Sequence, residues 1–301
     1  MKSAKLSLIC FLVTLYSFAG VSTTERQALL DFYNSTSGNN WNTNWDVNEP
    51  VSNWYGVVVK NDHVVELNLA FNNLNGVIPE SIGNLKHLVQ LNLFKNELSG
   101  NLPKSIGQLQ NLEGLNISFN KLDGALPQEI TTLKSLKEMQ LFMNRISGTI
   151  PESIGDLQQL KVLELYSNDL EGELPASIGE LSELNILLIS SNNISGRLPH
   201  NLGQLTKLKV LSVFDNNLFG TIPSTIGGLS NLEELVLSNN AFYGNLPNEL
   251  AALTNLKILM LGNNAFKGDL VSLQKKFPNI IEFNIDNNDN KGTIVTLDTE
   301  D

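Results

Sequence analysis

The stretch LKVLELYSNDLEGELPASIGELSE, residues 160–183, decides the fold, because its pattern returns every 24 residues along the chain. The template reads L-x-x-L-x-L-x-x-N-x-L-x-G-x-[IL]-P-x-x-I-G-x-L-x-x. Its ten copies begin at Val64, Leu88, Leu112, Leu136, Leu160, Leu184, Leu208, Leu232, Leu256 and Ile280. The template asparagine and the glycine four residues after it occur in every copy. A period of this length predicts a stacked array in which each unit contributes one short strand and neighbouring units close a shared core.

Local chemistry explains the residue types within one unit. Leu163 and Leu165 alternate along a strand, so both point inward while Glu164 points outward. Asn168 follows the strand, and its carboxamide can donate to and accept from backbone groups that would otherwise be buried without partners. Gly172 suits a turn that needs a positive φ. We therefore expect the asparagine column to be structural rather than ion-binding.

We divide the chain into a secretory signal peptide (residues 1–22), an N-terminal cap (residues 23–63) and a repeat domain (residues 64–301), whose last two degenerate repeats form the C-terminal cap. The first segment has two lysines, then an apolar run and then small residues, which is typical of a signal peptide. The only cysteine, Cys10, lies in this segment, so the processed chain would contain no disulfide. We expect a secreted or cell-surface protein.

The N-terminal cap is predicted to begin with a short helix. Thr24 and Gln27 have the spacing of a capping box, and Leu29, Phe32 and Tyr33 form one apolar helical face.

Three tryptophans, Trp41, Trp45 and Trp54, lie between this helix and the first repeat. A row of tryptophans can form a sugar-binding platform. Large aromatic side chains beside the open end of a stacked array are also what is needed to cover its first apolar rung, and we favour this second interpretation.

The order of a helix containing A-L-L, a tryptophan, then W-x-G-V-x-V and V-x-x-L-x-L resembles the N-terminal cap of the plant-type leucine-rich repeat family. The G-x-[IL]-P segment of the repeats resembles the same subclass. The resemblance implies an α/β fold: a curved leucine-rich repeat solenoid with parallel strands on its concave face and a helical N-terminal cap. Plant members usually have paired cysteines in this cap, whereas residues 54–59, WYGVVV, have valine there. In this respect the chain is similar to cysteine-free relatives in bacteria and protists.

Composition and motifs argue against several functional classes. The net charge of −11 disfavours a nucleic-acid partner. His63, His87 and His200 are interpreted as lying at different repeat phases, which predicts no metal or acid–base cluster. No nucleophile-elbow, zinc-protease or phosphate-loop motif occurs, and no later apolar run is long enough to span a membrane. We expect no enzyme activity, no cofactor and no metal.

Strand alternation leaves three columns of side chains pointing outward on the strand face. One column contains aromatic residues, and the other two turn apolar from the fifth repeat onward, whereas earlier repeats carry polar residues such as Glu138 and Gln140. Adjacent strands lie about 4.8 Å apart, so the apolar side chains should form one continuous exposed patch. The candidate partner-binding residues are Phe94, Phe142, Tyr166, Leu188, Val210, Phe214, Val236 and Met260.

Two interpretations of this patch stay open. Aromatic and branched side chains can stack along a sheet without any partner, whereas a large exposed apolar area usually binds something. We favour a secreted, non-catalytic protein that binds a macromolecule, either a protein or a glycan, through its concave face. The resemblance implies a recognition module like a receptor ectodomain, or an inhibitor of secreted polysaccharide hydrolases like the polygalacturonase inhibitors. The remaining alternative is a self-associating surface or matrix protein that forms a homodimer through the same patch.

Overall fold

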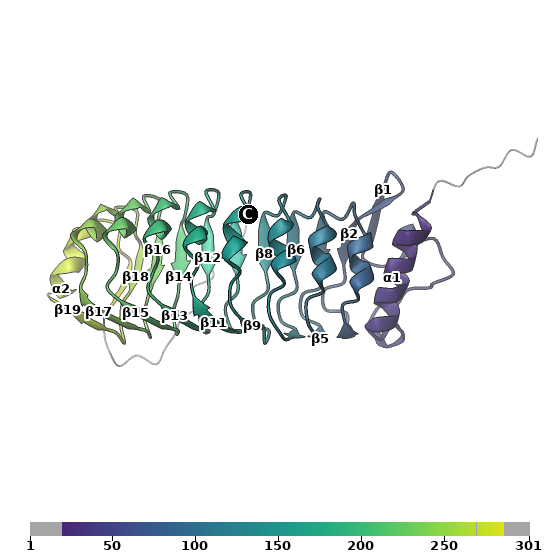
Figure 1. The fold of residues 1–301 in the computed structure, drawn as a ribbon, viewed down its shortest axis with the longest axis horizontal. Helices are drawn as coiled ribbons and strands as arrows, with labels where there is room; N and C mark the ends of the chain where they lie inside the picture. The colour runs from purple at the N-terminus through teal and green to yellow at the C-terminus, as the bar shows by residue number, and fades with distance from the viewer. Residues whose placement is uncertain (1–19, 269, 286–301) are drawn as a thin grey trace, which may run out of the picture.

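The computed structural model describes residues 20–268 and 270–285. The repeats stack into one elongated solenoid, with helix α1 at one end and the last described repeats at the other (Figure 1). The predicted solenoid of short parallel strands with an N-terminal helix is confirmed. Most of the signal peptide predicted over residues 1–22 lies outside the described residues, as do Asn288 and Gly292 of the tenth repeat.

The solenoid has two strand-bearing sides and one side of 3-10 turns. The helices are α1 (Thr23–Ser35) and α2 (Leu270–Leu273). The main sheet has eleven strands in the spatial order β1 (Val57–Lys60), β2 (His63–Asn68), β4 (Gln90–Asn92), β6 (Gly114–Asn116), β8 (Glu138–Gln140), β10 (Val162–Glu164), β12 (Ile186–Leu188), β14 (Val210–Ser212), β16 (Glu234–Val236), β18 (Ile258–Met260) and β20 (Glu282–Asn284). The second side has a three-stranded sheet of β3 (Asn75–Val77), β5 (Glu97–Gly100) and β7 (Lys121–Leu122), and a six-stranded sheet of β9 (Ser147–Gly148), β11 (Asp169–Glu173), β13 (Asn193–Gly196), β15 (Asn217–Gly220), β17 (Ala241–Asn245) and β19 (Ala265–Lys267). The 3-10 turns of the repeats are η3 (Glu80–Asn84), η4 (Lys104–Gln108), η5 (Gln128–Thr132), η6 (Glu152–Asp156), η7 (Ala176–Glu180), η8 (His200–Gln204), η9 (Ser224–Gly228) and η10 (Asn248–Ala252); η1 (Gly38–Asn40), η2 (Val51–Asn53) and η11 (Gln274–Lys276) lie near the ends.

Strands of the main sheet pair in parallel with the repeats before and after them. Leu163 lies opposite Met139 on one side and Leu187 on the other. One 24-residue period is therefore one complete coil. The exception is β1, which pairs antiparallel with β2 through a tight turn at Asn61 and Asp62, both at positive φ.

The template leucines and isoleucines fill the inside of each coil, and residues such as Leu163, Leu165 and Ile178 are fully buried. The two template glycines have different tasks. Gly172 has the predicted positive φ, at 79°. Gly179 lies where one 3-10 turn packs on the next, and a Cβ there would come within 2.2 Å of the main-chain oxygen of Asn201. The second glycine thus allows the 3-10 turns to stack closely.

The template asparagines form a hydrogen-bonded ladder along the solenoid. In the sixth repeat, Nδ2 of Asn192 donates to the main-chain oxygens of Leu165, Ile189 and Ser190. Its Oδ1 accepts from the main-chain N–H of Leu170 at 3.0 Å. Each carboxamide therefore bridges its own repeat and the preceding one, which confirms the structural role predicted for this column.

The cap replaces the missing neighbour at the N-terminal end of the ladder. Asn72, in the first repeat, has no earlier repeat to pair with. Instead its Oδ1 accepts from the main-chain N–H of Thr43 at 2.7 Å, and its Nδ2 donates to the Thr43 oxygen. The loop before the first repeat thus supplies the backbone groups that a preceding repeat would supply.

The capping box expected at Thr24 and Gln27 is wrong by two residues. Ser22 is the N-cap of α1, and its Oγ accepts from the main-chain N–H of Glu25. Glu25 is buried and also accepts from the main-chain N–H of Val64. This tertiary contact fixes the register of the helix start, which local spacing alone does not reveal.

The three cap tryptophans are buried in the same core as the repeat leucines, which confirms that they cover the first rung. Trp45 stacks on Trp54 with ring centroids 4.7 Å apart and meets Trp41 edge to face at 4.9 Å. The indole N–H of Trp45 donates to the main-chain oxygen of Tyr55. A sugar platform needs exposed rings, and these rings are not exposed.

Among the described residues, no helix has the length and apolar character needed to cross a membrane.

We predict that Asn192→Ala lowers the free energy of unfolding by about 1–3 kcal/mol, because it leaves buried backbone groups without partners. Asn193→Ala is the matched control, since Asn193 is the next residue and its side chain is exposed. The control should change stability by no more than about 0.5 kcal/mol. Urea melts of both variants measure the difference, and equal losses would contradict the role assigned to the ladder.

Candidate functional site

The strand face consists of the outward-pointing side chains of the main sheet. The structure places all eight predicted site residues on or beside this face, but their expected exposure is wrong for most of them. Five are buried: Phe142, Tyr166, Leu188, Val210 and Val236. Three are partly exposed: Phe94, Phe214 and Met260. Strands at this close spacing bring the side chains of successive repeats into contact, so the side chains cover one another.

Four of the buried residues form an apolar cluster separate from the main core. Phe142, Tyr166, Leu188 and Val210 pack together, with Phe94 and Ile186 partly buried against them. Phe142 and Tyr166 stack nearly parallel, with ring centroids 4.5 Å apart and 10° between their planes. Replacing these two rings would cost stability as well as any binding, since burial of one aromatic side chain contributes about 1.5–3 kcal/mol.

A continuous aromatic ridge crosses the first five repeats. It consists of Phe71, Phe94, Phe119, Phe142 and Tyr166. Successive ring centroids along it lie 5.1, 5.3, 5.6 and 4.5 Å apart. The first three contacts are edge to face, which aromatic pairs favour. The ridge therefore joins residues from two adjacent template positions into one surface.

Phe71 and Phe119 are the ridge residues that sequence analysis missed. They are 59% and 38% exposed, and Met143 occupies the equivalent position of the next repeat with 38% exposure. All three are at positive φ, between 52° and 58°. Such a φ is rarely adopted by large side chains. Later repeats have serine, aspartate or asparagine at this position, and that change in residue type was the available signal.

Polar side chains on the strand face form a chain of hydrogen bonds beside the ridge. Nδ2 of Asn116 donates to Oε1 of Gln140 at 3.1 Å, and Nε2 of Gln140 donates to Oε2 of Glu164 at 2.8 Å. Burial raises the pKa of Glu164, a shift that the Gln140 hydrogen bond opposes and the nearby charge of Glu138 strengthens. Burial, together with the charge of Glu164, raises the pKa of the Tyr166 hydroxyl to about 12.

A second carboxylate, Glu234, is buried on the strand face between Val210 and Ile258, its partners in register on β14 and β18. Burial raises the pKa of Glu234, and the charge of Glu233 adds to this shift, while Lys257 opposes it. The strand face therefore holds carboxylates in surroundings that disfavour their charge.

We predict that Glu234→Gln increases stability near pH 7 and changes it little near pH 4. The folded-state pKa of Glu234 is raised, so its contribution to stability is complete below the unfolded pKa and is lost as the pH rises through the folded pKa. Glutamine is neutral throughout and removes this loss. Urea melts at about pH 4 and about pH 7, on either side of the ordinary glutamate range, measure the difference.

Glu171→Gln on β11 is the matched control, because it makes the same chemical change on an exposed side chain. A gain of equal size in the control, or a loss of stability in Glu234→Gln near pH 7, would contradict the assignment.

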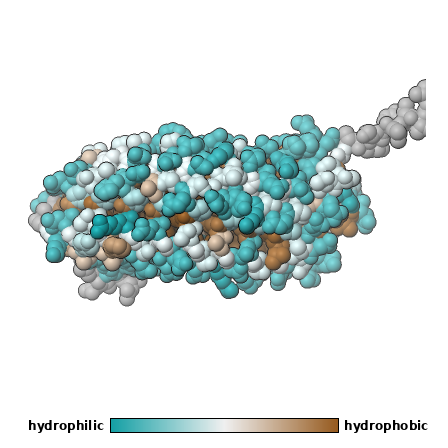
Figure 2. Space-filling model, viewed as in Figure 1, coloured by the Kyte–Doolittle hydropathy of each residue, from teal (hydrophilic) through white to brown (hydrophobic). Residues whose placement is uncertain are grey.

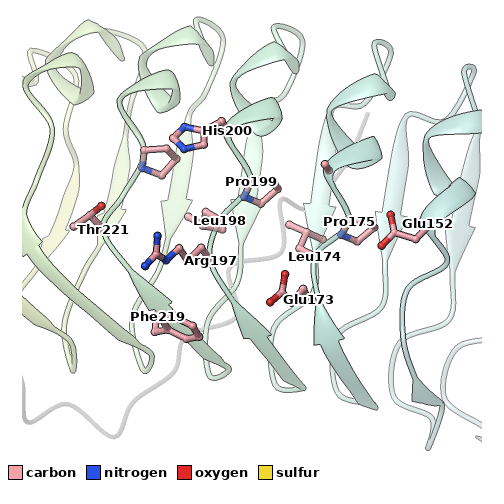
Figure 3. A pocket seen from close by; sticks show the side chains of 12 residues that line it. Glu152, Glu173, Leu174, Pro175, Arg197, Leu198, Pro199, His200, Phe219 and Thr221 are labelled. Atoms are coloured by element: carbon pink, nitrogen blue, oxygen red, sulfur yellow. The ribbon is translucent and has the colours of Figure 1, made fainter.

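The other notable surface is a groove of about 680 Å³ along the fourth to seventh repeats, between the 3-10 turns and the second side of strands. Leucines and prolines after the template glycine line its floor, and Glu173, Arg197 and His200 lie around it (Figure 3). Figure 2 shows apolar side chains in a row along the length of this side of the molecule, between hydrophilic bands. Among the described residues, no group of three metal-ligating side chains includes His200.

The histidine interpretation needs a correction. His63 and His87 are 24 residues apart, so they occupy the same phase of consecutive repeats, and the expectation of different phases is wrong. Their rings stack with centroids 3.5 Å apart. His200 does lie at a different phase.

A family model described as "Leucine-rich repeat region" matches residues 65–172 and 144–296. The chain belongs to the leucine-rich repeat family. Its relatives identify the plant type: over 67 residues, it is 42% identical to the LRR receptor-like serine/threonine-protein kinase EFR of Arabidopsis thaliana. That match covers 21% of this chain and 6% of the kinase.

Solved leucine-rich repeat structures are similar over most of the chain. The ectodomain of the receptor kinase GASSHO1/SCHENGEN3 from Arabidopsis thaliana, in complex with Casparian Strip Integrity Factor 2, is 31% identical with a TM-score of 0.77, and the match covers 84% of this chain and 32% of the ectodomain. The ectodomain of the Arabidopsis receptor kinase HAESA, in complex with a peptide hormone, is 29% identical with a TM-score of 0.61, over 87% of this chain and 49% of that one. A plant ice-binding protein is 26% identical with a TM-score of 0.76, over 88% of this chain and 86% of its own.

This leucine-rich repeat chain thus spans less than half of these two receptor ectodomains and a small part of the receptor kinase. The similarity covers the repeat scaffold.

Proposed function

We propose that this protein is a secreted, non-catalytic binding module that takes an extended segment of a protein or peptide along its strand face, anchored on the aromatic ridge. The observation that carries the proposal is the pair of exposed phenylalanines at positive φ, Phe71 and Phe119. Residues 1–22 would serve as the signal peptide. Of the eight strand-face residues predicted from the sequence, Phe94, Phe142 and Tyr166 belong to the ridge, and Leu188 and Val210 pack with its Phe142 and Tyr166 end.

Phenylalanine is an unfavourable choice at these two positions for folding alone. A bulky residue in the left-handed region costs of order 1–3 kcal/mol, and the seventh to ninth repeats reduce this cost with aspartate or asparagine. An exposed aromatic ring also leaves apolar surface in water. Both costs are offset if the rings are buried by a partner, since aromatic side chains are the commonest anchors of protein interfaces.

The charges on the strand face favour a basic or neutral partner. Within the described residues, the three outward columns of the main sheet contain Glu66, Glu138, Glu164, Glu234 and Glu282 and no lysine or arginine. A segment that combines apolar side chains with lysine or arginine would satisfy both the ridge and these carboxylates. The HAESA ectodomain, which has the same scaffold, was solved with a peptide hormone bound, and this supports a peptide ligand.

We predict that Phe119→Asn weakens partner binding by on the order of 2 kcal/mol while leaving stability nearly unchanged. Loss of the aromatic contacts costs about 0.5–1.5 kcal/mol, and asparagine relieves a backbone strain of similar size. Immobilised wild-type and variant proteins would be exposed to medium from the native source, and each captured protein or peptide would be quantified by mass spectrometry. Denaturant melts would measure stability.

Phe219→Asn on β15 is the matched control, because Phe219 is 42% exposed but lies on the second side of the solenoid. It should capture the same partner as the wild type. Equal capture by Phe119→Asn and the wild type would overturn the proposed site. A captured polysaccharide hydrolase would indicate the inhibitor function, and a concentration-dependent dimer in light scattering would indicate self-association through the strand face.

Ice is a second candidate ligand, because the plant ice-binding protein is similar over 86% of its own length. Thermal hysteresis of the purified protein tests it directly. A freezing gap that persists in Phe119→Asn would assign ice binding to another face of the solenoid.

A further inference from the structure

Three metal-ligating side chains from distant parts of the sequence meet beside the cap. Glu25 lies in the first turn of α1, His63 begins β2, and His87 lies shortly before β4. Nδ1 of His63 is 3.4 Å from Oε2 of Glu25, and Nδ1 of His87 is 3.9 Å from Oε1. One ligand atom from each side chain lies within 4.8 Å of the other two. This is the one such group within residues 20–268 and 270–285.

The repeat period creates the histidine pair. Because His63 and His87 occupy the same phase of consecutive repeats, their rings stack with centroids 3.5 Å apart and 19° between planes. Stacking in the same orientation brings both Nδ1 atoms to the same carboxylate. Two imidazole nitrogens and one carboxylate are thus presented from one side of the pair.

The surroundings of Glu25 favour a cation. Its side chain is 4% exposed, and its carboxylate contacts the Ser22 hydroxyl, the Val64 N–H and the two histidines. No lysine or arginine forms an ion pair with it within the described residues. A buried carboxylate is stabilised by a nearby positive charge, and a bound divalent ion supplies one.

The distances suit a small tetrahedral ion. Zinc binds nitrogen and oxygen at about 2.0–2.2 Å, so two ligands of a tetrahedral zinc lie roughly 3.4 Å apart. The two nitrogen–oxygen distances, 3.4 and 3.9 Å, are close to this value. The histidine side chains are 40% and 48% exposed, so their rings can turn slightly to aim both lone pairs at one point. Their exposure also gives the ion access from solvent.

We propose that Glu25, His63 and His87 bind a divalent zinc ion, with water completing the coordination. Imidazole and carboxylate ligands suit zinc, and a set of three protein ligands leaves one position open. The ion would tie the start of α1 to the first two repeats. It would therefore strengthen the cap that closes the open end of the solenoid.

Zinc chloride titration of chelator-treated protein tests this site. Wild-type protein should bind one zinc ion, show a thermal midpoint that rises with zinc concentration, and give the visible absorption of tetrahedral cobalt when Co²⁺ is substituted. His87→Gln should weaken zinc binding by at least about 100-fold, because even loss of an outer contact to a metal ligand costs 10–100-fold. His200→Gln, which changes the histidine in the outer groove, should bind as the wild type does.

His63→Gln is the second variant, and Glu25 is left unchanged because it also accepts hydrogen bonds from the N-cap residue Ser22 and from the N–H of Val64. Circular dichroism and the midpoint without metal show whether each variant folds. The proposal is overturned if folded wild-type protein does not bind zinc, or if the His63→Gln and His87→Gln variants bind it as tightly as the wild type. Loss of binding in His200→Gln alone would place the metal elsewhere and would likewise overturn it.

Discussion

Every coil of this solenoid must satisfy the backbone where the chain leaves the strand and turns across the core. The hydrogen bonds that join the carboxamide of Asn192 to the main-chain oxygens of Leu165 and Ile189 and to the N–H of Leu170 are buried. Asparagine combines donor and acceptor on a side chain short enough to stay in the turn. Because each carboxamide also bridges to the preceding repeat, the same hydrogen bonds that satisfy one turn hold two coils together.

This arrangement explains why the chain needs a built cap. A repeat at the end of the array lacks the backbone groups that its asparagine should contact, and its apolar side lacks a neighbour. The backbone of Thr43 supplies the contacts for the Asn72 carboxamide. The stacked rings of Trp45 and Trp54 cover the apolar side of the first repeat. The cap therefore copies the polar contacts of a repeat with a loop and its apolar contacts with aromatic rings, without repeating the template.

The sequence predicted what the period controls. The leucine columns, the asparagine ladder and the positive φ of Gly172 follow from one unit repeated at fixed spacing. The buried tryptophans follow from the open end that such an array leaves. Predictions from local sequence spacing failed where tertiary contacts determine the structure. The helix begins two residues before the predicted position, and there Glu25 also accepts from the N–H of Val64, 39 residues later. The same contact brought Glu25 to the histidines, although the period by itself already paired His63 with His87.

On the strand face, likewise, the periodic pattern predicts the direction of a side chain but not its exposure. Alternation correctly placed Phe142 and Tyr166 on the outward side, but their exposure depends on what the neighbouring repeats hold, and their stacked rings bury each other. Phe71 and Phe119 lie one position beyond the alternating strand, where a positive φ turns their side chains onto the ridge. That φ is set by the turn and not by the strand pattern.

The cap and the ridge are also physically connected. Nδ2 of Asn42 donates to the main-chain oxygen of Phe71 at 2.9 Å, so the cap loop holds the backbone of the most exposed ridge residue. In a solenoid, stability spreads through contacts between nearest neighbours, and a change at one end acts most strongly on the adjacent repeats. A change in the cap should therefore affect the conformation of the ridge more at Phe71 than at Tyr166. The buried, stacked pair of Phe142 and Tyr166 fixes the far end of the ridge by its own packing, whereas the near end is fixed by the cap.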